Sequence, residues 1–286
     1  PIWNIPLKHP INLAYEAATA DLNDVNMIDP FHLEAYGETT INYNRDVEVF
    51  PVLNAMFEKI MGESPYKSPT DMGVNMAGNC IFDFDAVHEA SKNEIVRRYY
   101  EACCKKVRGE GNESEITKIE LLMEQTGIDT SFRPVIEAAN KRSEETNNEP
   151  AAAIELPDGR IITGKTTSLL GASSAMLLNA LKALANIPKD IRLIPQDVIV
   201  PVMDLKTGSL GGHNPHLHID EILIALCVSA VTDENAAKAM KQLGKLKNCE
   251  VHSSVMLSSV DINVFKKLGV NLTCEPKYQT SKLYHS

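Results

Sequence analysis

The spacing of apolar residues changes about halfway along the chain. Between residues 83 and 145, apolar side chains recur every three to four positions in three consecutive stretches, which is the period of an amphipathic helix. These stretches predict helices over residues 83–108, 113–126 and 134–145. Gly127 follows the second stretch, where a glycine commonly ends a helix. The pattern therefore predicts a small helical subdomain over residues 83–147.

A polar linker at residues 144–150 precedes a mixed pattern. Two β-prone segments, 152–156 and 160–163, flank Pro157-Asp158-Gly159, which is a strong signal for a β-hairpin. Further along, the spacing predicts helices over 173–184, 196–206, 219–231, 233–247 and 261–268, and strands over 191–194, 251–257 and 270–274. This alternation predicts an α/β domain over residues 148–286, with a mixed sheet covered by helices. The fold class is thus α+β or α/β.

The first 82 residues show neither the helical period nor the alternation typical of a strand over a long stretch. Helices are predicted over residues 12–23 and 46–61, and two polar loops occupy residues 26–46 and 64–79. The chain opens at Pro1 with an apolar run and no initiator methionine, which is unusual for a frayed terminus. We interpret residues 1–82 as a loop-rich segment that completes a domain lying upstream and carries a binding or catalytic site.

The two polar loops hold the candidate site residues. Carboxylates and an imidazole supply acid–base groups or oxygen ligands for Mg²⁺, and a guanidinium or ammonium group holds phosphate or carboxylate. The candidate catalytic residues are Asp29, His32, Glu34, Asp46 and Asp71. The candidate substrate-binding residues are Tyr36, Asn42, Asn44, Arg45, Lys67 and Asn75. We predict that the two loops converge on one pocket; the alternative is a pair of solvated loops.

Composition narrows the class of partner. The chain has 286 residues, of which 44% are hydrophobic and 23% charged, with a formal net charge of −10. An acidic surface argues against nucleic acid and anionic membranes as main partners, and leaves a small-molecule ligand. The six cysteines contain no C-x-x-C pair, so reduced thiols in a cytoplasmic protein are expected. No apolar run is long enough to span a membrane, and we expect a homo-oligomer.

Two motifs suggest other chemistry. Residues 159–166 satisfy the phosphate-loop pattern G-x-x-x-x-G-K-[ST], but Gly159 belongs to the hairpin turn and residues 160–163 are β-prone, so we interpret the match as a coincidence. His213-x-x-His216-x-His218 is followed closely by Asp220, and imidazoles with carboxylates are transition-metal ligands. His218 and Asp220 are therefore candidate metal ligands. The alternative is a loop followed by a helix with acidic residues in its first turn.

Four stretches, residues 28–37, 42–46, 64–73 and 274–279, resemble the carboxy-terminal part of the bacterial family DUF1846, a domain of unknown function. The resemblance implies that members extend further at the amino end, with a nucleotide-binding-like region and a phosphate loop. It also implies a closing domain similar in topology to cytidine deaminase. The family pattern matches only His218 among the three clustered histidines. Deaminase zinc chemistry is not expected, because there is no C-x-x-C and the corresponding helix opens with Gly171-Ala-Ser-Ser.

Together these observations favour an enzyme that acts on a small polar or phosphorylated metabolite. The implied cofactor is a nucleotide with Mg²⁺, bound by a region upstream of this chain. The alternative, from a different functional class, is a non-catalytic assembly or regulatory module.

Overall fold

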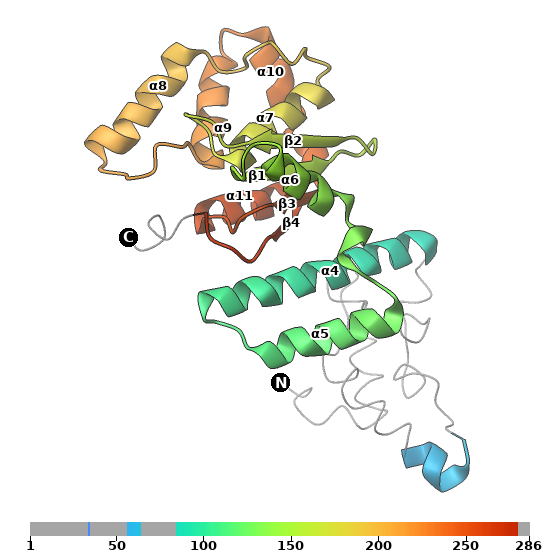
Figure 1. The fold of residues 1–286 in the computed structure, drawn as a ribbon. Coiled ribbons are helices and arrows are strands. Elements are labelled where there is room, and N and C mark those ends of the chain that lie inside the picture. The colour runs from blue at the N-terminus through green and yellow to red at the C-terminus, as the bar shows by residue number, and fades with distance from the viewer. Residues whose placement is uncertain (1–33, 35–55, 64–83, 280–286) are drawn as a thin grey trace, which may run out of the picture. The chain divides into compact units, whose positions relative to one another are not determined.

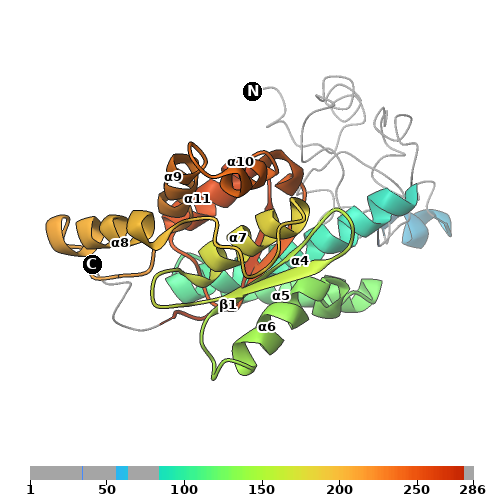
Figure 2. The same ribbon diagram turned by 90° about the horizontal axis from the view of Figure 1, so that it is seen from above.

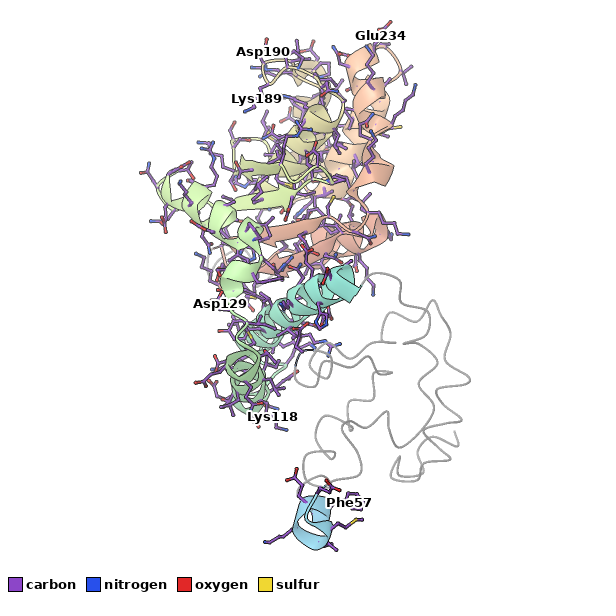
Figure 3. The ribbon with its side chains drawn as sticks, turned by 90° about the vertical axis from the view of Figure 1, so that its right-hand side faces the viewer. Phe57, Lys118, Asp129, Lys189, Asp190 and Glu234 are labelled. Atoms are coloured by element: carbon purple, nitrogen blue, oxygen red, sulfur yellow. The ribbon has the colours of Figure 1, made fainter. Side chains whose placement is uncertain are left out.

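The computed structural model describes residues 34, 56–63 and 84–279 (Figure 1; side chains in Figure 3). Two compact units are distinguished: residues 1–98 with 117–132, and residues 99–116 with 133–286. Residues 56–61 are helical, in agreement with the end of the helix predicted over 46–61. The helix predicted over 12–23 and most of the two polar loops lie outside the described residues.

Two long helices match the sequence prediction closely. Helix α4 spans Phe84–Arg108 and helix α5 spans Glu113–Thr126. Gly127, at a φ of +66°, follows α5 in the left-handed conformation that glycine adopts at low cost. Within α4, Glu94 accepts hydrogen bonds from Arg97 and Arg98, one turn further along the helix. A short 3-10 turn, η4 (Thr130–Phe132), leads to the next helix, α6 (Pro134–Glu144).

The second unit is built on a four-stranded mixed sheet. Its strands are β1 (Ala151–Glu155), β2 (Ile161–Lys165), β3 (Glu250–Ser253) and β4 (Asn271–Cys274), in the order β2-β1-β3-β4. Strands β1 and β2 form the predicted hairpin, with Gly159 at a φ of +78° in its turn. Strand β1 also pairs antiparallel with β3, while β3 and β4 are parallel. The predicted mixed sheet is therefore confirmed.

Helices cover both faces of this sheet. Along β1, Ala152 and Ile154 belong to the main core, whereas Ala153, which points to the opposite face, packs with Val135 and Ala139 of α6. The main core includes residues of α7 (Ala172–Leu184), α9 (Ile219–Ser229), α10 (Glu234–Met240) and α11 (Ser259–Leu268). Figure 2 shows α6 and α7 on opposite sides of β1. Helix α6, predicted as part of a separate helical subdomain, thus packs on the sheet.

Three predicted elements differ from the structure. No strand forms at 191–194; Leu193 and Ile194 are buried from an irregular segment, which an apolar run alone does not distinguish from a strand. The single helix predicted over 233–247 is divided into α10 and the 3-10 turn η6 (Leu243–Leu246). The strand predicted over 251–257 ends at Ser253, whose hydroxyl bonds to the carbonyl of Val255 and stabilises a turn.

Helix α7 lies unusually close to strand β2. A Cβ atom added at Gly164 would lie 2.1 Å from the backbone nitrogen of Met176 and 2.5 Å from its Cα. Gly164 is therefore required by close packing of helix on strand. Because Gly164 and Lys165 lie in a strand rather than in a loop before a helix, the phosphate-loop match at residues 159–166 is a coincidence, as the sequence indicated.

The remaining elements follow α7. Helix α8 (Gln196–Asp204) continues into a π-helical turn, η5 (Leu205–Ser209), where the helix predicted over 196–206 was expected to end. Five cysteines lie in the described part of the chain and all are free thiols, including the adjacent Cys103 and Cys104. Among the described helices, none is both long and apolar enough to cross a membrane.

Candidate functional site

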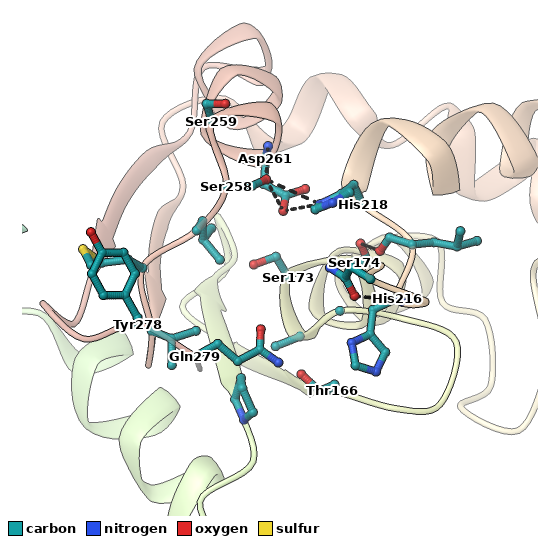
Figure 4. A pocket seen from close by; sticks show the side chains of 18 of the residues that line it. Thr166, Ser173, Ser174, His216, His218, Ser258, Ser259, Asp261, Tyr278 and Gln279 are labelled. Carbon is teal, nitrogen blue, oxygen red and sulfur yellow. Dashed lines mark hydrogen bonds and ion pairs between the residues drawn. The ribbon is translucent and has the colours of Figure 1, made fainter. Parts of the chain in front are cut away.

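A cavity of about 440 Å³ lies in the second unit, where the amino-terminal ends of three helices meet (Figure 4). Gly171, His218 and Ser258 are the N-cap residues of α7, α9 and α11, and all three line the cavity. Helix N-termini carry partial positive charge and unpaired N–H groups, so such a meeting point favours ligands that accept hydrogen bonds.

Leu217 fixes the histidine-containing loop against α7. Its N–H donates to the carbonyl of Leu169 at 2.8 Å, and residues 170 and 217 form an isolated parallel bridge. Its carbonyl accepts the hydroxyl of Ser174 at 2.9 Å and, more weakly, the N–H of Gly171 at 3.4 Å. Because Leu217 is held on both sides, its neighbours His216 and His218 are both presented to the cavity.

His218 is oriented by a buried carboxylate. Its Nδ1 lies 3.0 Å from Oδ2 of Asp261, which is only 8% exposed. Asp261 also accepts the N–H of Ile219 at 2.9 Å and the hydroxyl of Ser258 at 3.1 Å, so the carboxylate itself is held firmly. The hydrogen bond that His218 donates to Asp261 raises the pKa of the imidazole above its ordinary value. Within the described residues, Nε2 of His218 has no partner and is left for a ligand.

The pKa of the neighbouring histidine, His216, is shifted in the opposite direction. Burial lowers the pKa of His216 below its ordinary value, with Lys206 and His218 adding to the effect. Lys206 donates to the carbonyl of His216 at 2.8 Å and to Glu221 at 2.8 Å, and Glu221 accepts the N–H of His218 at 2.7 Å. Lys206 belongs to the π-helical turn η5, a type of irregularity that is frequent at functional sites.

The rest of the cavity wall is rich in hydroxyl groups and includes one guanidinium group, that of Arg108. Polar residues that line it include Arg108, Thr166, Ser173, Ser174, Asn214, Ser259, Tyr278 and Gln279. Among its lining residues, Asp261 is the single carboxylate, and it is already paired with His218. The cavity therefore offers mainly hydrogen-bond donors and positive charge, although the chain as a whole carries a net charge of −10.

The structure describes little of the predicted amino-terminal site. Of its members only Glu34 is described, and its Oε1 lies 2.9 Å from Nδ1 of His88 in the first unit. The remaining predicted residues lie outside the described part of the chain: Asp29, His32, Tyr36, Asn42, Asn44, Arg45, Asp46, Lys67, Asp71 and Asn75. Their convergence on one pocket stays a prediction.

The two predicted metal ligands point to different partners. Nδ1 of His218 is turned to Asp261, while Asp220 accepts the N–H of Glu221 at 2.9 Å. In the part of the chain that is described, no group of three or more His, Cys, Asp or Glu side chains is placed to hold a metal ion. Metal binding by His218 and Asp220 remains a prediction.

Sequence reasoning missed several residues of this cavity. Ser258-x-x-Asp261 is a helix-start signature, and it was readable as such, but the predicted helix began only at residue 261. Nothing in the sequence pairs Asp261 with His218, because 43 positions separate them. His216 was recognised as part of the histidine cluster, whereas Ser173 appeared only as part of a helix start.

Comparison with known proteins covers nearly the whole chain. Residues 1–127 match "Domain of unknown function DUF1846, N-terminal" and residues 131–284 match "Domain of unknown function DUF1846, C-terminal". The UPF0371 protein stu1377 of Streptococcus thermophilus is 56% identical over 284 residues, and the UPF0371 protein SpyM50764 of Streptococcus pyogenes is 55% identical over the same length. The alignments cover 99% of this chain but only 57% of each relative. The chain therefore belongs to the DUF1846 family, as its sequence motifs indicated.

Proposed function

We propose that the second unit is an enzyme domain that binds a small polar metabolite between α7, α9 and α11 and transfers protons to and from it. The observation that carries the proposal is the His218–Asp261 pair. A buried carboxylate holds Nδ1 of His218, a residue that lines the cavity, so the ring has a fixed orientation and its Nε2 is available for proton transfer.

The two histidines are suited to different roles. The raised pKa of His218 favours its protonated form, which can donate a proton to the ligand. The lowered pKa of His216 favours its neutral form, which can accept one. Neighbouring groups whose environments push their pKa values apart are typical of acid–base catalysis. Lys206 and Glu221 act as positioning residues, because they fix the backbone on either side of Leu217.

The topology of the second unit supports this location. We also propose the similarity to cytidine deaminase that the family resemblance implies; the order β2-β1-β3-β4, with α7 after β2 and α11 after β3, is compatible with it. In zinc deaminases the metal ligands lie at the starts of two helices. Here the starts of α7 and α11 carry Ser173, Ser174, Ser258 and Asp261. Hydroxyl groups are poor substitutes for the thiolates of that site, so we derive no zinc-dependent step.

The wider proposal concerns the complete protein. The chain spans 57% of the length of the relatives cited above. We propose that a nucleotide with Mg²⁺ binds outside this chain and that the two amino-terminal polar loops contribute to its site. We also propose a cytoplasmic homo-oligomer. The second candidate function, from a different functional class, is a non-catalytic assembly or regulatory module.

Proton transfer is tested without knowing the substrate. The full natural protein is incubated in D₂O with a bacterial small-molecule extract, and mass spectrometry follows deuterium incorporation and metabolite turnover. His218→Gln should lose every change that the wild type produces. His213→Gln is the matched control, because His213 is exposed in the same loop and does not line the cavity. Equal changes with His218→Gln, or no change with any protein, would refute the enzymatic proposal.

A further inference from the structure

The three helix starts at the cavity differ in how their N–H groups are satisfied. At α9, Glu221 accepts the N–H of His218 and Asp261 accepts that of Ile219. At α11, the hydroxyl of Ser258 accepts the N–H of Asp261 at 3.2 Å. At α7, the N-cap is Gly171, which has no side chain, and the first turn contains no acidic residue. Helix α7 alone among the three opens on the cavity without a cap.

Four donors are therefore left at the start of α7. The N–H groups of Ala172, Ser173 and Ser174 have no acceptor within the described residues. Ser173 is 4% exposed, and its Oγ is buried without a hydrogen-bond partner. Figure 4 shows this hydroxyl directed into the open part of the cavity. Buried polar groups without partners are uncommon in folded proteins, and such a group commonly has a functional role or bonds to water or an ion.

The hydroxyl of the next residue has a different role. Ser174 is also buried, but its Oγ donates to the carbonyl of Leu217 at 2.9 Å. Two adjacent serines in the same helical turn thus have separate tasks. Ser174 ties the histidine loop to α7, while Ser173 is free to bind whatever enters the cavity.

We propose that the start of α7, with the Ser173 hydroxyl, binds the phosphate group of a phosphomonoester. This inference rests on the proposed function and names its substrate class. A phosphate offers only acceptor oxygens, which matches a turn that offers N–H donors, a hydroxyl and the positive end of a helix dipole. Arg108, whose Nη1 lies 4.0 Å from Glu110, lines the same cavity and adds a cation, and the single lining carboxylate is paired with His218.

This placement also orients the rest of the ligand. Gly171 is hydrogen-bonded to Leu217, the residue between the two histidines. A phosphate held at α7 therefore leaves the organic part of the molecule in a cavity lined by His216 and His218. The phosphate subsite fixes the substrate, and the histidines act on the remaining part of it.

The test measures inorganic phosphate binding by calorimetry and ³¹P NMR on the full natural protein. Ser173→Ala should weaken phosphate binding by about tenfold or more, since a hydrogen bond to a charged acceptor is lost. Gly171→Asp should abolish binding, because its carboxylate would cap the same N–H groups and repel the anion. The site accommodates this residue, since Gly171 has an extended φ of −65° and an added Cβ would lie 3.7 Å from its nearest neighbour.

Ser229→Ala is the matched control. It removes a buried hydroxyl that bonds to the carbonyl of Ala225 within α9 and does not line the cavity, so phosphate affinity should stay within about threefold of wild type. Gly171→Asp and Ser173→Ala should melt at or above the wild-type temperature, which separates loss of binding from loss of folding. Unchanged phosphate affinity in both Ser173→Ala and Gly171→Asp would overturn the inference.

A second cavity supplies the competing explanation. It has a volume of about 490 Å³ and is lined by Arg142, Lys165, Lys182 and Arg192, without a carboxylate. If phosphate binding is lost in Lys165→Gln/Arg192→Gln but kept in Ser173→Ala, the site lies there and the inference is wrong. Acetate competing as well as sulfate would overturn the phosphate assignment. The proton-transfer test with His218→Gln is independent of these titrations, so either proposal can fail alone.

Discussion

Replacement of Gly164 by alanine tests how the helix that carries the candidate phosphate site is seated. The atoms that an added Cβ would meet are the nitrogen of Met176 at 2.1 Å, its Cα at 2.5 Å and the carbonyl oxygen of Ala172 at 2.8 Å. All three belong to the backbone of α7, so no side chain can rotate away. Ordinary van der Waals contact begins at 3.4 Å, which requires α7 and β2 to separate by about 1.3 Å at this point.

This displacement lowers the free energy of unfolding. Overpacking a core typically costs about 1–3 kcal/mol, and a clash with helix backbone belongs at or above the upper end of that range. For a domain of this size, about 3 kcal/mol corresponds to a melting temperature lower by roughly 6–12 °C. Because α7 carries Ser173, a shift of about 1 Å should also weaken phosphate binding severalfold or more.

Circular dichroism during heating and in urea provides the measurement. Gly208→Ala is the control, because nothing lies within 4 Å of the added Cβ and its backbone is not in the left-handed region. This control should melt within about 2 °C of the wild type. A melting temperature for Gly164→Ala that equals the control would refute close packing of α7 on β2. Lost nucleotide affinity with unchanged stability would instead favour a phosphate loop at this glycine.

Three further outcomes are expected. Asp261→Asn should lower the pKa of His218 measured by NMR. Because a raised histidine pKa stabilises the fold below the ordinary value of 6.5, and this stabilisation is lost as pH rises through the folded pKa, the variant should lose more stability at pH 6 than at pH 9. Equal loss of stability at both pH values would contradict the His218–Asp261 pairing. Without denaturant, a thiol reagent should label exposed Cys227 first and Cys274 slowly, since burial raises the pKa of Cys274 to about 12. Denatured protein without reductant should yield all six thiols. Arg133→Met should lower the free energy of unfolding, measured in urea, by about 3–5 kcal/mol, because Arg133 is fully buried and binds the Glu250 carboxylate at 2.6 Å. A decrease below about 1 kcal/mol would show that the ion pair is dispensable.

The sequence alone determined most of the helices and the hairpin. Apolar spacing located α4, α5 and α6 to within a residue or two, because each buries one continuous stripe of its surface. Pro157-Asp158-Gly159 identified the hairpin turn, because the turn geometry depends on local residues only. The same local logic identified the phosphate-loop match as a coincidence.

Short apolar runs were harder to interpret. Residues 191–194 have the composition of a strand, yet Leu193 and Ile194 fill the core from an irregular segment. Burial requires apolar side chains in either case, and only the presence of a neighbouring strand decides which backbone forms. The strand order is likewise a tertiary outcome, since β1 pairs with β3 across about a hundred residues.

In the candidate site, the sequence identified individual residues, whereas the fold decided their partners. The sequence singled out His218 for its density of neighbouring imidazoles and carboxylates, and it located the start of α7 at Gly171-Ala-Ser-Ser. It paired His218 with Asp220, its near neighbour, whereas the fold turns the ring towards Asp261 of another helix. A side chain's hydrogen-bond partner is set by distance in space, and sequence separation says little about that distance once helices pack against one another.

Tertiary structure alone decided which of the two serine hydroxyls at the start of α7 faces the cavity. Locally, Ser173 and Ser174 are equivalent residues in the first turn of a helix that starts with glycine. Leu217, which arrives from a loop more than forty residues away, takes the hydroxyl of Ser174 and leaves that of Ser173 facing a cavity. Local sequence sets which donors a helix start possesses, but only the packing of distant segments decides which of those donors remain available to a ligand.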